Sequence, residues 1–455
     1  MGKYFGTDGI RGIANQDLGV ELAYRVGLAA ATVLSREQHH KPRITIGKDT
    51  RISGDMLEAA LCSGLCAAGA DVMELGVVPT PAVAFITRDC GADAGIVISA
   101  SHNPFEHNGI KIFNGQGFKL SDALENEIEE YLDDPARLKL CTHGDIGRVI
   151  GRGQEYVQRY IDHVVQTADG PIRRLRVLID CANGAASRTA GEIFERLGLD
   201  LEVIKDHPDG VNINDGCGST HMDQLCRLVV SGGYDLGLAF DGDADRCLAV
   251  DELGQLVDGD KIMGICGSYM RSQGKLKKDT IVATVMSNLG FHDFTEAHGL
   301  HLECTTVGDR YVLECMLQNG YNLGGEQSGH MIFLDDTTTG DGQLTAVKLL
   351  RVLSTQDQPL SRLAAEIPYY PQTLINVPVS GGNVVKEKLM ADPELKELVA
   401  QEDARLGKRG RVLVRASGTE ALIRVMVEAP EEALAQSCAE GLAKIINLKA
   451  ESKNY

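Results

Sequence analysis

The sequence of 455 residues contains no tryptophan, and aromatic residues make up only 5% of it. Proteins that bind single-stranded nucleic acid stack the bases on aromatic rings, so this composition argues against that function. Basic residues are also too few: 45 Lys and Arg stand against 64 Asp and Glu, a formal net charge of −19. That balance argues against a nucleic-acid partner, but small phosphorylated substrates need only a few local cations.

Long apolar runs are absent as well. No segment approaches the roughly 18 apolar residues that cross a bilayer, and the opening residues 1–12, MGKYFGTDGIRG, lack the apolar core of a signal peptide. The 12 cysteines are too sparse for a disulfide scaffold. Neither a Walker P-loop nor a Rossmann G-x-G-x-x-G is present, so nucleotide and NAD chemistry has no local support. We therefore expect a soluble cytoplasmic protein with no membrane or nucleic-acid partner.

A strand–turn–helix–strand pattern recurs three times in the first three-quarters of the sequence. Its opening strands are expected at residues 43–47, 176–180 and 280–287, and each precedes a turn and a helix. This pattern is typical of the βαβ unit of a parallel sheet. The strands are mostly continuous apolar runs, as expected where a sheet is covered on both faces.

The last part of the sequence has a different pattern. Strands are expected at residues 374–379, 411–415 and 422–428, with one amphipathic helix after the first strand, up to about Leu406, and a final helix from about Glu431. Because the last two strands are close in sequence, this part is predicted to be a small α+β domain. The fold class is thus α/β, with three related α/β domains of mixed or parallel sheets and a C-terminal α+β domain. The expected domains are residues 1–150, 151–255, 256–368 and 369–455.

An acidic turn, DGDADR, follows one apolar strand and precedes another. Asp241, Asp243 and Asp245 alternate along it, so their carboxylates can converge on one cation, and oxygen ligands favour Mg²⁺ or Ca²⁺. An EF-hand is disfavoured because Arg246 replaces the glycine of that loop and strands flank it. A solvated acidic turn without a metal is the simpler alternative.

A serine turn, SASHNP, follows the apolar run at residues 94–98. Ser101 is therefore expected just past a strand end, where ligands collect in open α/β sheets. A nucleophile is one interpretation, and a helix cap or Asx turn before Pro104 is the other. Lys111 is expected on the next strand, where it faces either an anion or solvent.

Three further loops carry polar groups. Glu326, Ser328 and His330 alternate in GGEQSGH, so on an extended segment they would point the same way and could bind sugar hydroxyls. An ordinary polar loop is the alternative. Nearby VGDRYV is a second short polar loop. FGTDGIRG and GKDTRISG, residues 5–12 and 47–54, are cationic turns.

The loop RASGTE joins the two closely spaced strands of the last domain. Ser417, Gly418 and Thr419 can present backbone N–H groups to an oxyanion, and Arg415 and Arg424 can add charge. A plain hairpin loop is the alternative.

Five segments in order, FGTDGIRG, SASHNPFEHNGIKIF, DGDADR, GGEQSGH and RASGTE, resemble the α-D-phosphohexomutase superfamily over the whole length of the chain. Within it, the sequence is most similar to the bacterial phosphoglucosamine mutases. The resemblance implies four domains around a central cleft, and an isomerase that converts glucosamine 6-phosphate to glucosamine 1-phosphate for UDP-N-acetylglucosamine and cell-wall synthesis. It also implies a phosphoserine at Ser101, one Mg²⁺ held by that phosphoserine with the three aspartates, and glucosamine 1,6-bisphosphate as intermediate.

Roles for individual residues follow from the same resemblance. The catalytic candidates are Ser101, His102, Lys111, Arg11 and His330, with Arg11 expected to orient Ser101. The metal ligands are Ser101, Asp241, Asp243 and Asp245. The substrate-binding candidates are Arg246, Gly308, Asp309, Glu326, Ser328, Arg415, Ser417, Gly418, Thr419 and Arg424.

Other functions compatible with these motifs are a phosphomannomutase/phosphoglucomutase acting on neutral hexose phosphates, a catalytically silent sugar-phosphate sensor, and a Mg²⁺-dependent phosphatase. The sequence does not decide between a monomer and a homodimer. The hinge of a closing cleft is expected around Pro368–Pro371, because few residues need to absorb a rotation there.

Overall fold

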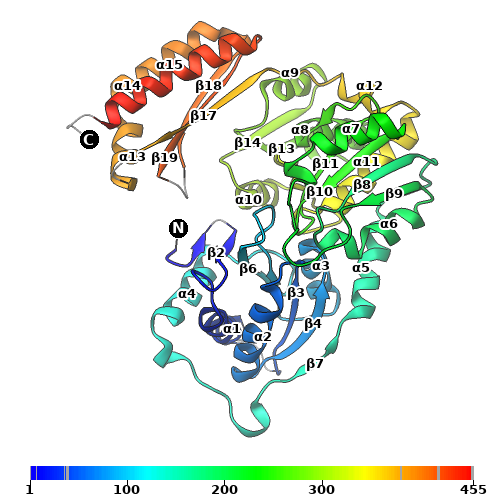
Figure 1. Ribbon diagram of the computed structural model, residues 1–455, viewed down its shortest axis with the longest axis vertical. Coiled ribbons are helices and arrows are strands. Elements are labelled where there is room, and N and C mark those ends of the chain that lie inside the picture. The colour runs from blue at the N-terminus through cyan, green and yellow to red at the C-terminus, as the bar shows by residue number, and fades with distance from the viewer. Residues whose placement is uncertain are drawn as a thin grey trace. The chain divides into compact units, whose positions relative to one another are not determined.

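The computed structural model describes residues 2–6, 8–34, 36, 40–379, 382–417 and 421–451. The chain divides into two compact units. The N-terminal unit comprises residues 1–286 and 300–365, and the C-terminal unit comprises residues 287–299 and 366–455. Each is described below by itself, with element labels as in Figure 1.

The first sheet of the N-terminal unit has seven strands. In spatial order these are β1 (Phe5–Gly6), β2 (Gly9–Ile13), β6 (His107–Asn114), β5 (Ala94–Ile98), β3 (Arg43–Lys48), β4 (Asp71–Val77) and β7 (Val149–Arg152). Strands β5, β3, β4 and β7 run parallel, whereas β6 is antiparallel to β5 and β2. The helices that follow these strands are α1 (Val20–Leu34), α2 (Gly54–Ala67), α3 (Thr80–Asp89) and α4 (Asp122–Asp133).

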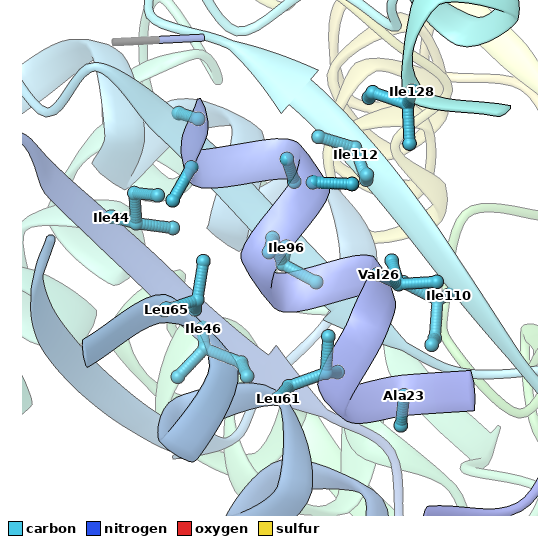
Figure 2. Close-up of a cluster of buried hydrophobic side chains, with 14 of the residues drawn as sticks. Ala23, Val26, Ile44, Ile46, Leu61, Leu65, Ile96, Ile110, Ile112 and Ile128 are labelled. Carbon is cyan, nitrogen blue, oxygen red and sulfur yellow. The ribbon is translucent and has the colours of Figure 1, made fainter. Parts of the chain in front are cut away.

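Helix α1 packs its apolar side chains on this sheet. Figure 2 shows Ala23 and Val26 of α1 among isoleucines of the sheet, with Leu61 and Leu65 of α2 beside them. The two helices approach each other closely because Gly64 lies against Tyr24: a Cβ at residue 64 would stand 2.1 Å from the Tyr24 carbonyl oxygen. This packing holds α1 and α2 against the first sheet. Ser101 and Thr80 follow the ends of two strands of that sheet.

Two smaller sheets complete the N-terminal unit. The five-stranded sheet has the order β12 (Leu256–Val257), β11 (Cys247–Asp251), β10 (Leu236–Phe240), β8 (Arg176–Asp180), β9 (Asp200–Ile204). The four-stranded sheet has the order β14 (His301–Thr305), β13 (Thr280–Thr284), β15 (Leu323–Gly325), β16 (Met331–Phe333). Their helices are α5 (Gln154–Gln166), α6 (Ala190–Arg196), α7 (Asp223–Gly232), α8 (Gly259–Ser272), α10 (Asp309–Asn319), α11 (Gly342–Gln356) and α12 (Leu360–Ala364).

The predicted repeat is confirmed by strand direction. The pairs β3–β4, β8–β9 and β13–β14 are each parallel and each joined by a helix. The third opening strand is shorter than predicted, because it ends at Thr284 rather than at residue 287. No helix of the described residues is long and apolar enough to cross a membrane.

The C-terminal unit is built on an antiparallel sheet of β17 (Gln372–Pro378), β19 (Leu422–Glu428) and β18 (Arg411–Ala416), in that spatial order. Helices α13 (Gly382–Ala391), α14 (Pro393–Leu406) and α15 (Glu432–Ala450) accompany it, and α15 contributes Leu442 and Ile446 to its core. The single helix predicted up to Leu406 is wrong. Asp392 ends α13 and caps α14 with its side chain, and Pro393 begins the new helix.

The C-terminal unit also contains α9 (Leu289–Ala297), which lies between β13 and β14 in sequence. The fully buried carboxylate of Glu428 holds this helix start to the sheet. It accepts from the Asn288 amide at 3.2 Å, the Leu289 N–H at 3.0 Å and the Gln372 amide at 2.9 Å. Arg411 pairs with it at 2.9 Å. A buried charge with this many donors is stable only while its partners are in place.

We predict that Glu428→Ala lowers the free energy of unfolding of the C-terminal unit by about 3 kcal/mol, because Arg411 loses its buried counter-charge and three further donors lose a charged acceptor. Thermal and denaturant unfolding measure the loss. The control is Glu387→Ala, which removes an exposed glutamate of α13. Equal stabilities of the two variants would contradict the prediction.

Candidate active site

Three buried carboxylates meet on the turn between β10 and β11. Asp241, Asp243 and Asp245 are at most 5% exposed, and each offers an oxygen within 4.8 Å of the others. The turn is tight because Phe240 and Cys247, the ends of the two strands, are directly paired. The sequence prediction that these side chains converge is confirmed by this geometry.

The chemistry of this cluster fits a hard cation. One oxygen of Asp243 and one of Asp245 are buried without a hydrogen-bond partner among the described residues. Burial, reinforced by the charges of Asp245 and Asp243, raises the pKa of Asp241 well above its usual range. Carboxylates crowded in this way are relieved by a divalent ion with oxygen ligands.

Ser101 lies three residues beyond the end of β5, and its Oγ donates to Asp241 Oδ2 at 2.6 Å. The serine is 1% exposed, and its φ of 52° lies in the left-handed region. That conformation costs a non-glycine residue roughly 1–2 kcal/mol, so the surrounding structure must hold it. The loop therefore aims the hydroxyl at the carboxylate cluster.

Thr80, at the start of α3, connects the helices and strands of the first sheet to the acidic turn. Its Oγ1 donates to Asp243 Oδ2 at 2.7 Å, and its N–H donates to the Asp243 carbonyl at 2.9 Å. The positive end of the helix dipole thus faces an ionised carboxylate, which is a favourable arrangement.

Lys111 on β6 reaches the same cluster from the other side. Its ammonium group is 2.9 Å from Asp243, 3.0 Å from Asp8 and 3.5 Å from Asp245. Although burial opposes it, the carboxylates of Asp243 and Asp8 raise the pKa of Lys111 well above its usual value. The lysine faces anions rather than solvent, which settles the alternative that the sequence left open.

The ion pairs continue away from the acidic turn. Asp8 accepts from Lys119 at 2.6 Å, and Lys119 also bonds to Asp309, whose carboxylate is 3.5 Å from His330 Nε2. Arg11, expected to orient Ser101, donates instead to Asp8. Charges of alternating sign therefore connect the acidic turn to the loop that contains His330.

His102 adjoins the serine and is held by a cation. Its Nδ1 is 3.4 Å from Ser101 Oγ and 3.1 Å from Arg246 Nη1. Because an arginine only donates, Nδ1 is the acceptor and the ring proton sits on Nε2. Burial, together with the charges of Arg246 and Arg11, lowers the pKa of His102 to about 4, so the imidazole is neutral at physiological pH.

The GGEQSGH segment is a tight turn between β15 and β16, so the extended conformation predicted for it is wrong. Glu326 accepts from the Gly308 N–H at 3.2 Å, so the two predicted loops are neighbours. Ser328 Oγ and both ring nitrogens of His330 are buried without a hydrogen bond among the described residues. Such groups are unusual in a folded protein and are typical of a functional site.

The last predicted loop belongs to the C-terminal unit. Arg415 of β18 and Arg424 of β19 are directly opposite each other in the sheet. Their charges therefore add up at one position of the sheet, where like charges repel each other. Ser417 is buried, and its carbonyl accepts from Lys386 at 2.8 Å. Gly418 and Thr419 lie outside the described residues.

Sequence reasoning missed several residues at the centre of the N-terminal site. Thr80 follows a strand end, as Ser101 does, and that position was the available signal. Asp8 and Arg51 lie in the two cationic turns, but the partners that connect them to the site, Lys111 for Asp8 and the Ser101 carbonyl for Arg51, are distant in sequence. Asn214, which donates to the Ser101 carbonyl at 2.9 Å, had no signal at all.

Comparison with known protein families matches four successive segments of the chain. Four domain families of phosphoglucomutase/phosphomannomutase match in order: alpha/beta/alpha domain I over residues 2–138, domain II over 158–254, domain III over 258–370, and the C-terminal domain over 374–445. The fold is therefore that of a phosphohexomutase.

Individual relatives identify the family within the phosphohexomutases to which the chain belongs. The phosphoglucosamine mutase of Acetivibrio thermocellus is 52% identical over 447 residues, covering 98% of this chain and 99% of the relative. That of Geobacillus thermodenitrificans is 50% identical over 449 residues, covering 98% of each. The chain belongs to the phosphoglucosamine mutase family.

Solved structures agree with this fold. A phosphoglucomutase/phosphomannomutase family protein from Burkholderia thailandensis is 25% identical, with a TM-score of 0.82 and 98% of both chains covered. N-acetylphosphoglucosamine mutase from Aspergillus fumigatus, solved with GlcNAc-6P and magnesium, is 18% identical with a TM-score of 0.69, covering 98% of this chain and 96% of the other.

We predict that the His102 ring does not titrate between about pH 5 and pH 8, where an unperturbed histidine would. Arg246→Gln should raise the pKa of His102 by removing a neighbouring positive charge. Histidine NMR spectra recorded against pH, with His102→Asn to identify the signal, make the measurement. A His102 signal with an ordinary midpoint in the unmodified protein would contradict the prediction.

Proposed function

We propose that the chain interconverts glucosamine 6-phosphate and glucosamine 1-phosphate through a phosphorylated Ser101 and a 1,6-bisphosphate intermediate. The observation that carries this proposal is the 2.6 Å contact between Ser101 Oγ and Asp241 of a buried carboxylate triad. Relatives about 50% identical over nearly the whole chain support the aminosugar substrate over neutral hexose phosphates.

The reaction consists of two phosphoryl transfers on one serine. In the first, the C1 hydroxyl of glucosamine 6-phosphate attacks the phosphoserine: the O1–P bond forms, the Oγ–P bond breaks, and the hydroxyl gives up its proton. The bisphosphate then turns around, and its 6-phosphoryl group passes to Ser101 while O6 regains a proton. Such transfers depend mainly on positioning and charge neutralisation.

The charged groups around Ser101 suit these steps. Asp241, Asp243 and Asp245, with an oxygen of the phosphoserine, would hold one Mg²⁺, which when bound neutralises charge on the transferred group. Lys111 supplies a fixed positive charge beside the same site. Arg246 and the neutral His102 adjoin Oγ, so His102 orients rather than carries a proton at physiological pH.

Proton transfer is assigned to His330. Its ring is 3% exposed and close to the Asp309 carboxylate, and its nitrogens have no hydrogen bond among the described residues. Glu326 and Ser328 of the same turn are the candidates for the sugar hydroxyls, which must be recognised in both orientations of the bisphosphate.

The phosphate that is not reacting needs its own cation site. The opposed arginines Arg415 and Arg424, with Ser417, are the candidates for that site. Arginine binds phosphate oxygens through paired N–H groups, which suits a phosphate that must be released and bound again. In this proposal the product is a precursor of the UDP-N-acetylglucosamine used in cell walls. The 12 free thiols are compatible with the reducing environment of the cytoplasm.

Turnover measurements test the function directly. The unmodified protein should act faster on glucosamine 6-phosphate than on glucose 1-phosphate or mannose 1-phosphate. Ser101→Ala should lose the covalent phosphate seen by intact-mass measurement, and its activity should fall at least about 1,000-fold because the covalent route is gone. Ser121→Ala, which removes an exposed hydroxyl before α4, is a control expected to keep the covalent phosphate.

The outcomes separate the competing functions. Preference for the neutral hexose phosphates would identify a phosphomannomutase/phosphoglucomutase, and binding without turnover would identify a sensor. Release of inorganic phosphate as the main product would identify a phosphatase. Near-normal turnover by Ser101→Ala would overturn the covalent mechanism.

The metal ligands make a second prediction. Asp243→Asn should weaken Mg²⁺ binding, on the order of 10-fold or more, because it removes an anionic oxygen ligand. Calorimetric titration of Mg²⁺ into the protein measures binding without reference to turnover. Asp251→Asn, at the far end of β11, is the matched control. Full activity of the unmodified enzyme in excess chelator would exclude the metal.

The cation site of the C-terminal unit makes a third prediction. Arg415→Ala should raise KM for glucosamine 6-phosphate about 10- to 100-fold, as expected for a lost charged hydrogen bond. The phosphate on Ser101 should remain, and free 1,6-bisphosphate should accumulate because the turning intermediate is held less well. Loss of the covalent phosphate with an unchanged KM would show that Arg415 acts on the serine instead.

A further inference from the structure

The serine loop is held through its carbonyl oxygens. Arg51, in the turn before α2, donates from Nη2 to the carbonyls of Ser101 and Asn103, both at 2.9 Å, and from Nη1 to that of Pro104. Its Nε donates to Asp49 at 2.9 Å, and both side chains are 0% exposed. One planar guanidinium group therefore spans the whole loop, a geometry that lysine does not reproduce.

A second side chain binds the same carbonyls from the next sheet. The Asn214 amide nitrogen donates to the Ser101 carbonyl at 2.9 Å and to the Asn103 carbonyl at 3.0 Å. Asn214 is 6% exposed and lies on the loop after β9. Because Ser101 is in the left-handed region, these donors act on a conformation that the residue does not favour by itself.

The acidic turn is fitted against this clamped loop. A Cβ at Gly242, between Asp241 and Asp243, would stand 2.5 Å from the Ser101 carbonyl oxygen and 2.8 Å from the Asn214 amide nitrogen. The carbonyl, the amide and the acidic turn therefore pack together without room for a side chain. A displacement of the carbonyl would change the distance between Ser101 Oγ and the carboxylates.

We propose that Arg51 and Asn214 are positioning residues that clamp the Ser101 carbonyl, fixing the serine in its left-handed conformation with Oγ facing the acidic turn. The inference rests on the proposed function and extends it to residues that the proposed phosphoryl transfers do not otherwise use. In this arrangement the clamp acts on the chemical step, because the nucleophile must be placed within a fraction of an ångström.

The test compares Asn214→Ala with Asn212→Ala. Asn212 lies on the same loop, and within the described part of the chain its side chain bonds to Asp209 and His207 of that loop alone. Asn214→Ala should lower kcat for glucosamine 6-phosphate about 100-fold, with KM and the Kd for Mg²⁺ unchanged within about twofold and Tm within about 3 °C of the control. Arg51→Lys should likewise lower kcat with KM and the Kd for Mg²⁺ unchanged, because the positive charge is kept while the planar array of guanidinium N–H donors is lost.

A readout on the serine itself keeps the test independent of the sugar. The ³¹P resonance of phosphorylated Ser101 should shift or broaden in Asn214→Ala and stay unchanged in Asn212→Ala. Unchanged kcat and an unchanged resonance would overturn the proposal, as would a fall in Tm with a normal kcat, since that outcome describes a merely structural contact.

Failure of the proposed function gives a different result. Unmodified protein with no turnover of glucosamine 6-phosphate would overturn the function, and the ³¹P comparison would still decide on the clamp. If Asn214→Ala does not purify as a folded protein, Asn214→Ser gives the same comparison with a smaller change of volume. If the kcat of Asn214→Ser equals that of Asn212→Ala, the proposal is overturned.

Discussion

Electrostatic repulsion among three buried carboxylates is the constraint on which the N-terminal unit depends. Asp241, Asp243 and Asp245 are all buried, and each offers an oxygen within 4.8 Å of the others. Like charges so close cannot all ionise unless positive charge compensates them. Lys111 and Arg246 supply part of that compensation, while one oxygen each of Asp243 and Asp245 has no hydrogen-bond partner among the described residues.

The compensation extends beyond the turn because each buried cation needs an anion of its own. Lys111 is shared with Asp8, Asp8 with Lys119, and Lys119 with Asp309. Despite burial, the cations Lys111, Lys119 and Arg11 hold the pKa of Asp8 well below its usual range. Charged groups arranged in this way gain little net stability, so their value lies in holding loops from three sheets in register.

Local sequence patterns predicted those parts of the structure that neighbouring residues determine. The alternation of aspartates in DGDADR was enough to predict a convergent site, because a tight turn between paired strands brings alternate residues together. The parallel strand pairs were predictable because each strand and its following helix are contiguous. The break between α13 and α14 was also predictable from Pro393, because a proline disfavours the helical conformation of the residue before it.

Contacts between distant residues could not be predicted in the same way. Arg51 and Asn214 lie 50 and 113 residues from the serine whose carbonyl they bind, and no periodicity connects them. The conformation of the GGEQSGH loop was predicted wrongly for another reason. Strands β15 and β16 have three residues each, too few to show a strand pattern. The turn between them therefore looked extended, although the neighbourhood of Glu326 and Gly308 depends on its being folded back.

Helix α9 has a consequence for how this chain can be divided. The chain passes between the two units at residues 286/287, 299/300 and 365/366. A fragment that begins at Glu366 would take Glu428 with it but leave behind Asn288 and Leu289. Recombination or gene fusion that transfers residues 366–455 alone would therefore remove contacts from the interior of the C-terminal unit. The unit can be transferred intact only together with residues 287–299.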